Sequence, residues 1–227
     1  MTNVKLLLCS LLLVSVPATS DGADWIQLFN GKDIDAWTSR GGEASYTVED
    51  GVLVGTTKTN TPNTFLCPKQ KFGDFELTFD VKCDEGLNSG VQIRSIDNAK
   101  LIPNGLTKVE KEKATRRVKQ SSLCGPQVEI AANGNAGAVW FEGVGGWLLE
   151  PKPELTAKAY KKDGWNSYRV VAKDAKIQVW INGTKIADAQ ETRTHMKSGY
   201  LGFQVHGIGK RTETFQVRWK NIKIREL

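Results

Sequence analysis

Three short stretches of the sequence place a glutamine two residues before an ionisable side chain. They are NSGVQIRS, GPQVEI and GYLGFQVHG, which contain the pairs Gln92 and Arg94, Gln127 and Glu129, and Gln204 and His206. Apolar residues alternate with these pairs, so an extended strand would carry the polar side chains on one face and the apolar ones on the other. If the three strands share a sheet, their polar faces form one patch of hydrogen-bonding groups that suits the hydroxyls of a sugar.

Aromatic residues and a further amide accompany this patch. Trp140 shares a strand face with Ala138 and Glu142, and Trp147 follows the glycine-rich run GVGG at 143–146. Indole faces pack against the C–H patches of sugar rings, and Asn88 adds an amide at the start of the first stretch. The residues expected to bind a saccharide are therefore Gln92, Gln127, Gln204, Asn88, Trp140 and Trp147.

The ionisable members of the three pairs have a structural alternative to a catalytic role. Glu129 and Arg94 would satisfy each other if they formed a half-buried ion pair. The two interpretations are compatible, because a nearby arginine would also keep Glu129 ionised.

The elements that must position these residues are short strands. Patterns of alternation bounded by turn residues predict strands over 25–29, 46–49, 52–56, 74–82, 89–95, 126–130, 138–141, 165–173, 176–181, 200–205 and 215–225. Many short strands with frequent turns and little helical periodicity are typical of a β-sandwich or barrel. A chain of 227 residues is long enough for one such domain.

Two segments of this pattern predict side-chain directions in detail. The stretch WNSYRVVAKDAKIQVWING at 165–183 predicts a hairpin whose alternate residues, from Tyr168 to Ile181, need a second sheet to cover them. The final strand, FQVRWKNIKIREL, points Phe215, Val217, Trp219, Ile222 and Ile224 inward. Its alternation slips at Lys220-Asn221, which indicates a bulge.

The first twenty residues have the composition of a secretion signal. Lys5 precedes an apolar run of 11 residues, and Pro17 is followed by small residues suited to a signal peptidase. We expect residues 1–20 to be cleaved and residues 21–227 to form one secreted or periplasmic domain without membrane insertion. A retained anchor is the alternative.

The remaining cysteines, Cys67, Cys83 and Cys124, match no zinc-binding spacing. In an oxidising compartment, they would form either one disulfide plus one thiol or three buried thiols. The sequence does not choose a pairing.

Positive charge is concentrated in one segment. The chain has a formal net charge of +6, and residues 100–120 hold seven Lys and Arg against two Glu, a net +5. The segment contains no aromatic residue, whereas nucleic-acid-binding segments interleave aromatic and basic side chains. We expect a solvated insertion loop over about 97–123 and no nucleic-acid partner; contact with a polyanion or acidic glycan is the alternative.

Several ordered blocks of the sequence resemble a known family. GLNSGVQIRS at 86–95, GPQVEI at 125–130, GAVWFEGVGGWLLEP at 137–151, the 165–183 hairpin, and GYLGFQVHG with WKNIKIREL are similar to the 3-keto-disaccharide hydrolase domain. The opening WIQLFNGKDIDAWT also fits, so the resemblance covers almost all of residues 24–227. It implies a concanavalin A-like jelly-roll sandwich of two antiparallel sheets, on a secreted bacterial protein.

The resemblance also implies a reaction on glycosides whose sugar carries a ketone at carbon 3. The ketone acidifies the proton on carbon 2, and removing this proton leads to expulsion of the aglycone and then to addition of water. His206 is expected as the base, and Arg94 or a divalent cation (calcium, magnesium or manganese) as the positive group beside the oxyanion. Glu129 is open between a ligand of that cation, an acid for the leaving group and an alternative base. Gln127 and Gln204 would orient hydroxyls.

Two departures from the family pattern bear on these roles. Many family members carry Asp at the position of Glu129, and the basic segment is unusual and would reshape the rim of the cleft. The sequence has no strand with carboxylates at the E-x-D-x-x-E spacing of conventional glycosidases of this fold. A non-catalytic carbohydrate-binding module or lectin is the alternative, since one fold supports both functions. The sequence does not say whether a partner sugar dehydrogenase supplies the oxidised substrate.

Overall fold

The computed structural model describes residues 24–97, 112, 123–193 and 196–227. The expected signal peptide, at 1–20, lies outside these residues, and so does nearly all of the expected basic loop at 97–123. In the described part of the chain, no helix is long and apolar enough to cross a bilayer. Its three cysteines are buried and form no disulfide.

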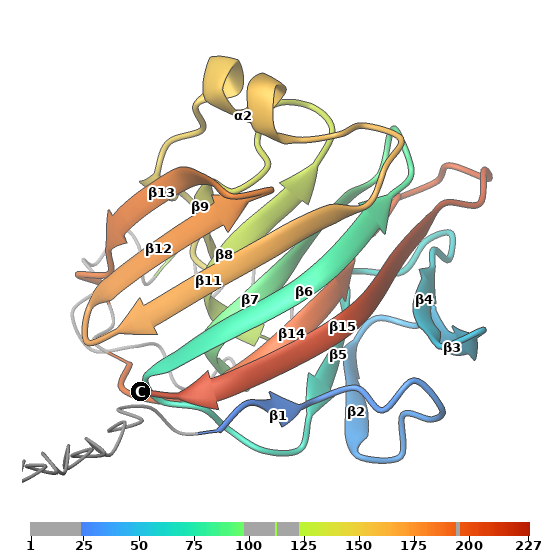
Figure 1. Cartoon of the computed structure of the whole chain (residues 1–227). Helices are drawn as coiled ribbons and strands as arrows, with labels where there is room; N and C mark the ends of the chain where they lie inside the picture. The colour runs from blue at the N-terminus through green and yellow to red at the C-terminus, as the bar shows by residue number, and fades with distance from the viewer. Residues whose placement is uncertain (1–23, 98–111, 113–122, 194–195) are drawn as a thin grey trace, which may run out of the picture.

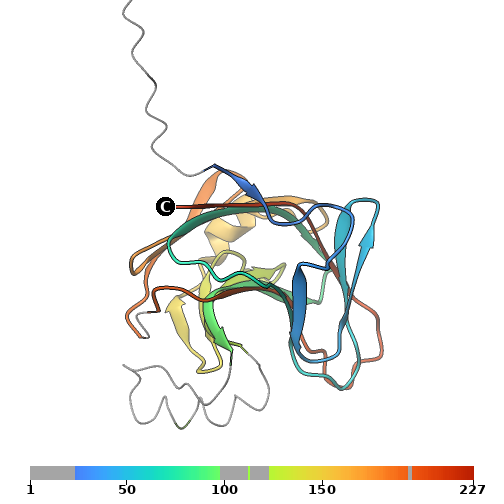
Figure 2. The same ribbon diagram turned by 90° about the horizontal axis from the view of Figure 1, so that it is seen from below.

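Two antiparallel sheets pack face to face, and Figure 2 shows them edge-on as two layers. One sheet, called the back sheet because the cavity described below lies on the other, is nearer the viewer in Figure 1. It contains β13 (Thr184–Gln190), β12 (Lys176–Ile181), β11 (Asn166–Lys173), β6 (Phe75–Cys83), β15 (Gln216–Glu226), β4 (Val52–Thr56) and β3 (Ser45–Glu49), in that order, with β1 (Ile26–Gln27) beside β15. The front sheet contains β10 (Trp147–Leu149), β9 (Val139–Glu142), β8 (Leu123–Ala131), β7 (Asn88–Asp97), β14 (Tyr200–Val205), β5 (Thr64–Pro68) and β2 (Trp37–Gly41). This is the jelly-roll sandwich that the sequence predicts.

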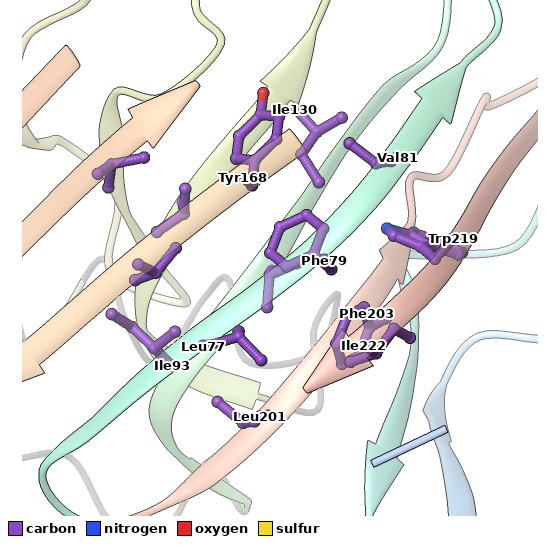
Figure 3. Packing of buried hydrophobic residues seen from close by; sticks show 14 of the residues in the cluster. Leu77, Phe79, Val81, Ile93, Ile130, Tyr168, Leu201, Phe203, Trp219 and Ile222 are labelled. Carbon is purple, nitrogen blue, oxygen red and sulfur yellow. The ribbon is translucent and has the colours of Figure 1, made fainter. Parts of the chain in front are cut away.

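The core between the sheets is built from the apolar faces of both. Phe79 of β6 and Phe203 of β14 meet edge to face with ring centroids 6.0 Å apart, and Trp219 of β15 packs on Phe203 at 5.9 Å. Figure 3 shows these rings with Leu77, Val81, Ile93 and Ile130 filling the space between the layers. Because Phe203 belongs to GYLGFQVHG, the polar side chains that alternate with it face away from the core.

The two detailed strand predictions are confirmed. Tyr168, Val170 and Ala172 of β11 and Ile177, Val179 and Ile181 of β12 are all buried. In β15 the register against β6 shifts between Lys220 and Lys223, and Asn221 adopts a positive φ of 54°. The bulge keeps Ile222 and Ile224 in the core.

Four strands and one helix were not among the sequence expectations. They are β2, β5, β10, β13 and α2 (Pro153–Ala159), which lies at the top of Figure 1. Strand β5 is buried at every position, so its residues do not alternate between apolar and polar. Helix α2 is a short helix that Pro153 begins, too short for a helical period to be recognised in the sequence.

Candidate active site

The front sheet carries an open cavity of about 670 Å³ on the face turned away from the core. Strands β8, β7 and β14, which hold the three glutamine pairs, are neighbours in this sheet. Six of the predicted residues line the cavity: Asn88, Gln127, Glu129, Trp140, Trp147 and His206. The volume lies within the range of small-molecule sites and suits a saccharide.

The register of the sheet explains why these side chains meet. Gln92 of β7 lies opposite Gln127 of β8, and Gln127 lies opposite Trp140 of β9. Trp140 in turn lies opposite Trp147 of β10, and the two indoles meet edge to face with centroids 5.0 Å apart. One row of cross-strand neighbours therefore runs from buried amides to an aromatic wall.

Glu129 is the buried carboxylate of the cavity, with only 3% of its surface exposed. Burial raises its pKa from 4.5 to about 7, and the charge of Glu142 acts in the same direction. Gln127 donates to Glu129 Oε1 at 2.6 Å, and Asn88 is 3.4 Å from Oε2; both hydrogen bonds oppose the rise. A carboxyl group with this pKa exchanges a proton readily at neutral pH.

A chain of buried side chains continues behind Gln127. Its Oε1 accepts from Gln92 Nε2 at 2.7 Å, and Gln92 Oε1 accepts from the Ser95 hydroxyl at 2.6 Å. Gly90 leaves room for this arrangement, because a Cβ there would stand 2.7 Å from Cγ and Cδ of Gln127. The geometry requires a residue without a side chain at position 90.

His206 enters the cavity just beyond the end of β14, where it is half-buried. Its Nδ1 lies 2.8 Å from the carbonyl oxygen of Gly207. Because a carbonyl can only accept, Nδ1 carries a proton, and Nε2 is left to exchange one.

Asn63 joins two sides of the cavity. Its Oδ1 accepts from the Gly207 amide at 2.9 Å, and its Nδ2 donates to Glu142 at 3.2 Å. The hydrogen bonds connect the segment that holds His206 to the strand that holds Trp140.

The expectation that Arg94 shares this cavity is wrong. Arg94 lines a separate hollow of about 550 Å³ with Asp74, Asp174 and Glu191. Its guanidinium pairs with Asp74 at 2.6 Å and donates to the carbonyl oxygens of Gly73, at 2.7 Å, and Asp174. The register of β7 against β8 shifts between Gln92 and Ile96, and Arg94 has a φ of 46°, so the alternation of the sequence stops before Arg94. Arg94 and Glu129 therefore occupy different hollows and form no ion pair with each other.

Gln92 and Gln204 do not line the cavity either, although both lie in the front sheet. Each is fully buried, and the Gln92 amide is engaged by Gln127 and Ser95. Both side-chain polar atoms of Gln204 lack a hydrogen-bond partner. These placements leave Gln127 as the one predicted glutamine at the cavity wall.

Further lining residues come from loops and were not expected from the sequence: Asn60, Thr61, Pro62, Asn63, Asn135, Gly143, Gly207 and Gly209. Glu142 also lines the cavity, because it shares a strand face with Trp140. The run TNTPN at 59–63 carries a turn signal but no alternation of apolar and polar residues, so its proximity to His206 arises only from the tertiary fold. Among the described residues, no group of three or more His, Cys, Asp or Glu side chains is placed to hold a metal ion.

Comparison with known proteins identifies the family. The model of the 3-keto-alpha-glucoside-1,2-lyase-like domain matches residues 24–225. The chain belongs to this family. No curated protein matches the sequence of this lyase-like domain.

Solved structures share the fold of this lyase-like domain. A candidate glycosyl hydrolase from Parabacteroides distasonis is 23% identical, with a TM-score of 0.60 over 89% of this chain and 94% of its own. The carbohydrate-binding module CBM66 from Bacillus subtilis is 14% identical, with a TM-score of 0.56 over 84% and 96%. A Bacillus subtilis protein of unknown function with a galectin-like fold is 12% identical, with a TM-score of 0.54 over 89% and 94%. At these identities, the likeness establishes the jelly-roll fold alone.

Proposed function

We propose that this protein is a lyase that cleaves glycosides carrying a ketone at carbon 3, with later addition of water giving net hydrolysis. The single observation that carries the proposal is Glu129, a buried carboxyl group with a pKa of about 7 in a cavity of sugar size. A carboxylate with this pKa is suited to removing a proton from the carbon beside a ketone. Family membership supplies the substrate class.

In the proposed reaction, Glu129 takes the proton from carbon 2, and the electrons of the C–H bond form an enediolate with the carbon-3 ketone. The base expected from the sequence is His206, but the buried carboxylate with its amide donors fits this step better. The enediolate collapses, the bond from carbon 1 to the aglycone oxygen breaks, and His206, carrying a proton on both ring nitrogens for this step, gives its Nε2 proton to that oxygen. Water then adds to carbon 1 of the enone and its released proton returns to Nε2 of His206, while the Glu129 proton, exchanged with solvent water, passes to carbon 2.

Trp140 and Trp147 support this assignment as walls for the sugar ring, and the amides of Asn60, Asn63 and Asn88 supply hydrogen bonds to hydroxyls and to the developing oxyanion. Cleavage of residues 1–20 would place the protein outside the cytoplasm, where a separate dehydrogenase acting on the same glycosides would supply the ketone.

A non-catalytic carbohydrate-binding module is the second candidate, because the paired tryptophans and the amide-rich rim would serve a lectin equally well. The two candidates differ at Glu129. A binding module gains nothing from a carboxyl group held at neutral pKa, whereas a lyase needs one.

The deciding experiment follows the release of sugar from a 3-oxidised disaccharide and from its unoxidised parent. The lyase assignment predicts release from the oxidised compound alone, with a loss of about 100-fold or more in the Glu129→Gln variant. Binding of the oxidised disaccharide without any conversion would contradict the lyase and support the module.

A further inference from the structure

Behind the carboxyl group of Glu129 lies a buried hydrogen-bonded chain of three side chains: Gln127, Gln92 and Ser95. All are 2% exposed or less, and their hydrogen bonds of 2.6 to 2.7 Å follow one another without a break. Each donor points toward Glu129: the Ser95 hydroxyl to Gln92, the Gln92 amide to Gln127, and the Gln127 amide to Glu129 Oε1. Successive hydrogen bonds of one polarity strengthen one another in a buried setting.

The two oxygens of Glu129 therefore have different surroundings. Oε1 accepts the short bond from Gln127, so a proton on Oε1 would face a donor. Oε2 has only the long contact of 3.4 Å with Asn88 Nδ2, and the Oδ1 atom of Asn88 is buried without a partner. By turning its amide, Asn88 can donate to an ionised Oε2 or accept from a protonated one.

We propose that Gln127, backed by Gln92 and Ser95, is a positioning residue that keeps Oε1 as a permanent acceptor, so that Oε2 alone exchanges the proton of the substrate. The inference rests on the proposed lyase function and deepens it, because it states which oxygen acts and what holds it. Gly90 is part of the same arrangement, because the side chain of any larger residue would displace Gln127 from its hydrogen bond with Glu129.

The test measures the proton on Glu129 directly and needs no substrate. The pKa of Glu129 is followed by carboxyl carbon NMR, with the resonance assigned by its absence in Glu129→Gln. Three variants change the hydrogen-bonded chain itself: Gln127→Met, Gln92→Met and Ser95→Ala. A fourth, Gly90→Ala, displaces Gln127 without changing any residue of that chain. The matched control is Gln204→Met, which makes the same substitution at a buried glutamine of β14, the strand beside β7. The side chain of Gln204 has no hydrogen bond to the hydrogen-bonded chain.

If Gln127, Gln92 and Ser95 position Glu129 in this way, the rise in the pKa of Glu129 should be graded across the variants. Loss of the Gln127 donor raises the pKa of Glu129 by about one pH unit or more, Gln92→Met raises it less, and Ser95→Ala least. Gly90→Ala raises it in the same direction as Gln127→Met, and Gln204→Met leaves it unchanged. Equal pKa values in all these variants, or the same rise in the Gln204→Met control, would overturn the proposal.

The infrared C=O stretch of protonated Glu129 reports which oxygen carries the proton. If Oε2 carries it, Oε1 is the carbonyl that Gln127 holds, so Gln127→Met moves the stretch to higher frequency. An unchanged stretch would assign the proton to Oε1 and overturn the inference. Since both readouts use the protein alone, failure to cleave a 3-oxidised disaccharide would reject the lyase function without affecting this test.

Discussion

At the scale of single residues, the chemistry of the site follows from where one carboxyl group is buried. Glu129 lies among amides and indoles, and no contact joins it to a basic side chain of the described residues. Two neutral donors cannot offset the loss of water around a charge, so the pKa rises. The same burial makes Glu129 expensive in its ionised form, and this has a measurable consequence for stability.

We expect the folded protein to lose stability as pH rises from about 4.5 to 7. Below 4.5 Glu129 is protonated in both states; above it the unfolded chain ionises first, and the folded state follows only near 7. Through this group the free energy of unfolding should fall by up to about 3 kcal/mol. Glu129→Gln should therefore equal the wild type at pH 4.5 and be more stable at pH 8, as measured by urea unfolding.

Glu43→Gln is the control for this prediction, because Glu43 is an exposed carboxylate whose pKa is lowered by Lys58. Glu43→Gln should leave the difference in the free energy of unfolding between pH 4.5 and pH 8 nearly as in the wild type. A Glu129→Gln protein that is less stable than the wild type at pH 8 would show that the ionised carboxylate stabilises the fold.

At the scale of elements, the alternation of side chains along strands predicted more of the site than any single residue did. Alternation placed Gln127 and Glu129 on the polar face, and the register of β7, β8 and β14 then brought three separate sequence motifs together. It failed at Arg94, because a bulge with a positive φ is a local event that a period-two pattern does not encode. It also missed Asn63, since a loop residue acquires its neighbours only from the tertiary fold.

Asn63 provides the prediction at this scale. Asn63→Ala removes the hydrogen bonds to Gly207 and Glu142, which join the His206 segment to β9. We expect a loss of about 1 to 2 kcal/mol in unfolding free energy, and a decrease of roughly 10-fold in kcat/KM for a 3-oxidised disaccharide because the site is less well positioned.

Asn30→Ala is the matched change, since Asn30 makes local hydrogen bonds in an exposed turn near Asp33. It should leave kcat/KM unchanged. Equal kcat/KM in the two variants and the wild type would mean that Asn63 does not organise the cavity.

At the scale of the whole molecule, residues that we expected from the sequence to share one site lie in two separate hollows of the sandwich. The cavity of Glu129 and His206 lies on the front sheet, and the hollow of Arg94 lies where β7 meets the start of β6 and the turn between β11 and β12. Arg94 thereby ties the front sheet to the back sheet. Fold class and family could be read from the sequence, because they depend on patterns spread along the chain; the division between the hollows depends on one bulge.

Arg94→Met tests this division. Removing the guanidinium breaks the ion pair of Asp74, which keeps only the Asp174 amide as a donor, and takes a donor from the carbonyl oxygens of Gly73 and Asp174. We therefore expect the free energy of unfolding to fall by roughly 2 to 4 kcal/mol. The kcat/KM of the folded variant should stay within about three-fold of the wild type, because Arg94 does not reach the cavity. A loss of kcat/KM comparable to that of Glu129→Gln, with stability unchanged, would return Arg94 to the catalytic site.

The most direct test of proton removal by Glu129 is the fate of the hydrogen on carbon 2. A 3-oxidised disaccharide labelled with deuterium at carbon 2 is incubated in ordinary water with the wild type and with Glu129→Gln, and the label is followed by mass spectrometry. The proposed lyase reaction predicts that the wild type removes the deuterium and releases the aglycone, and that Glu129→Gln does neither at a comparable rate. Release of the aglycone by the wild type with the deuterium still on carbon 2 would contradict it.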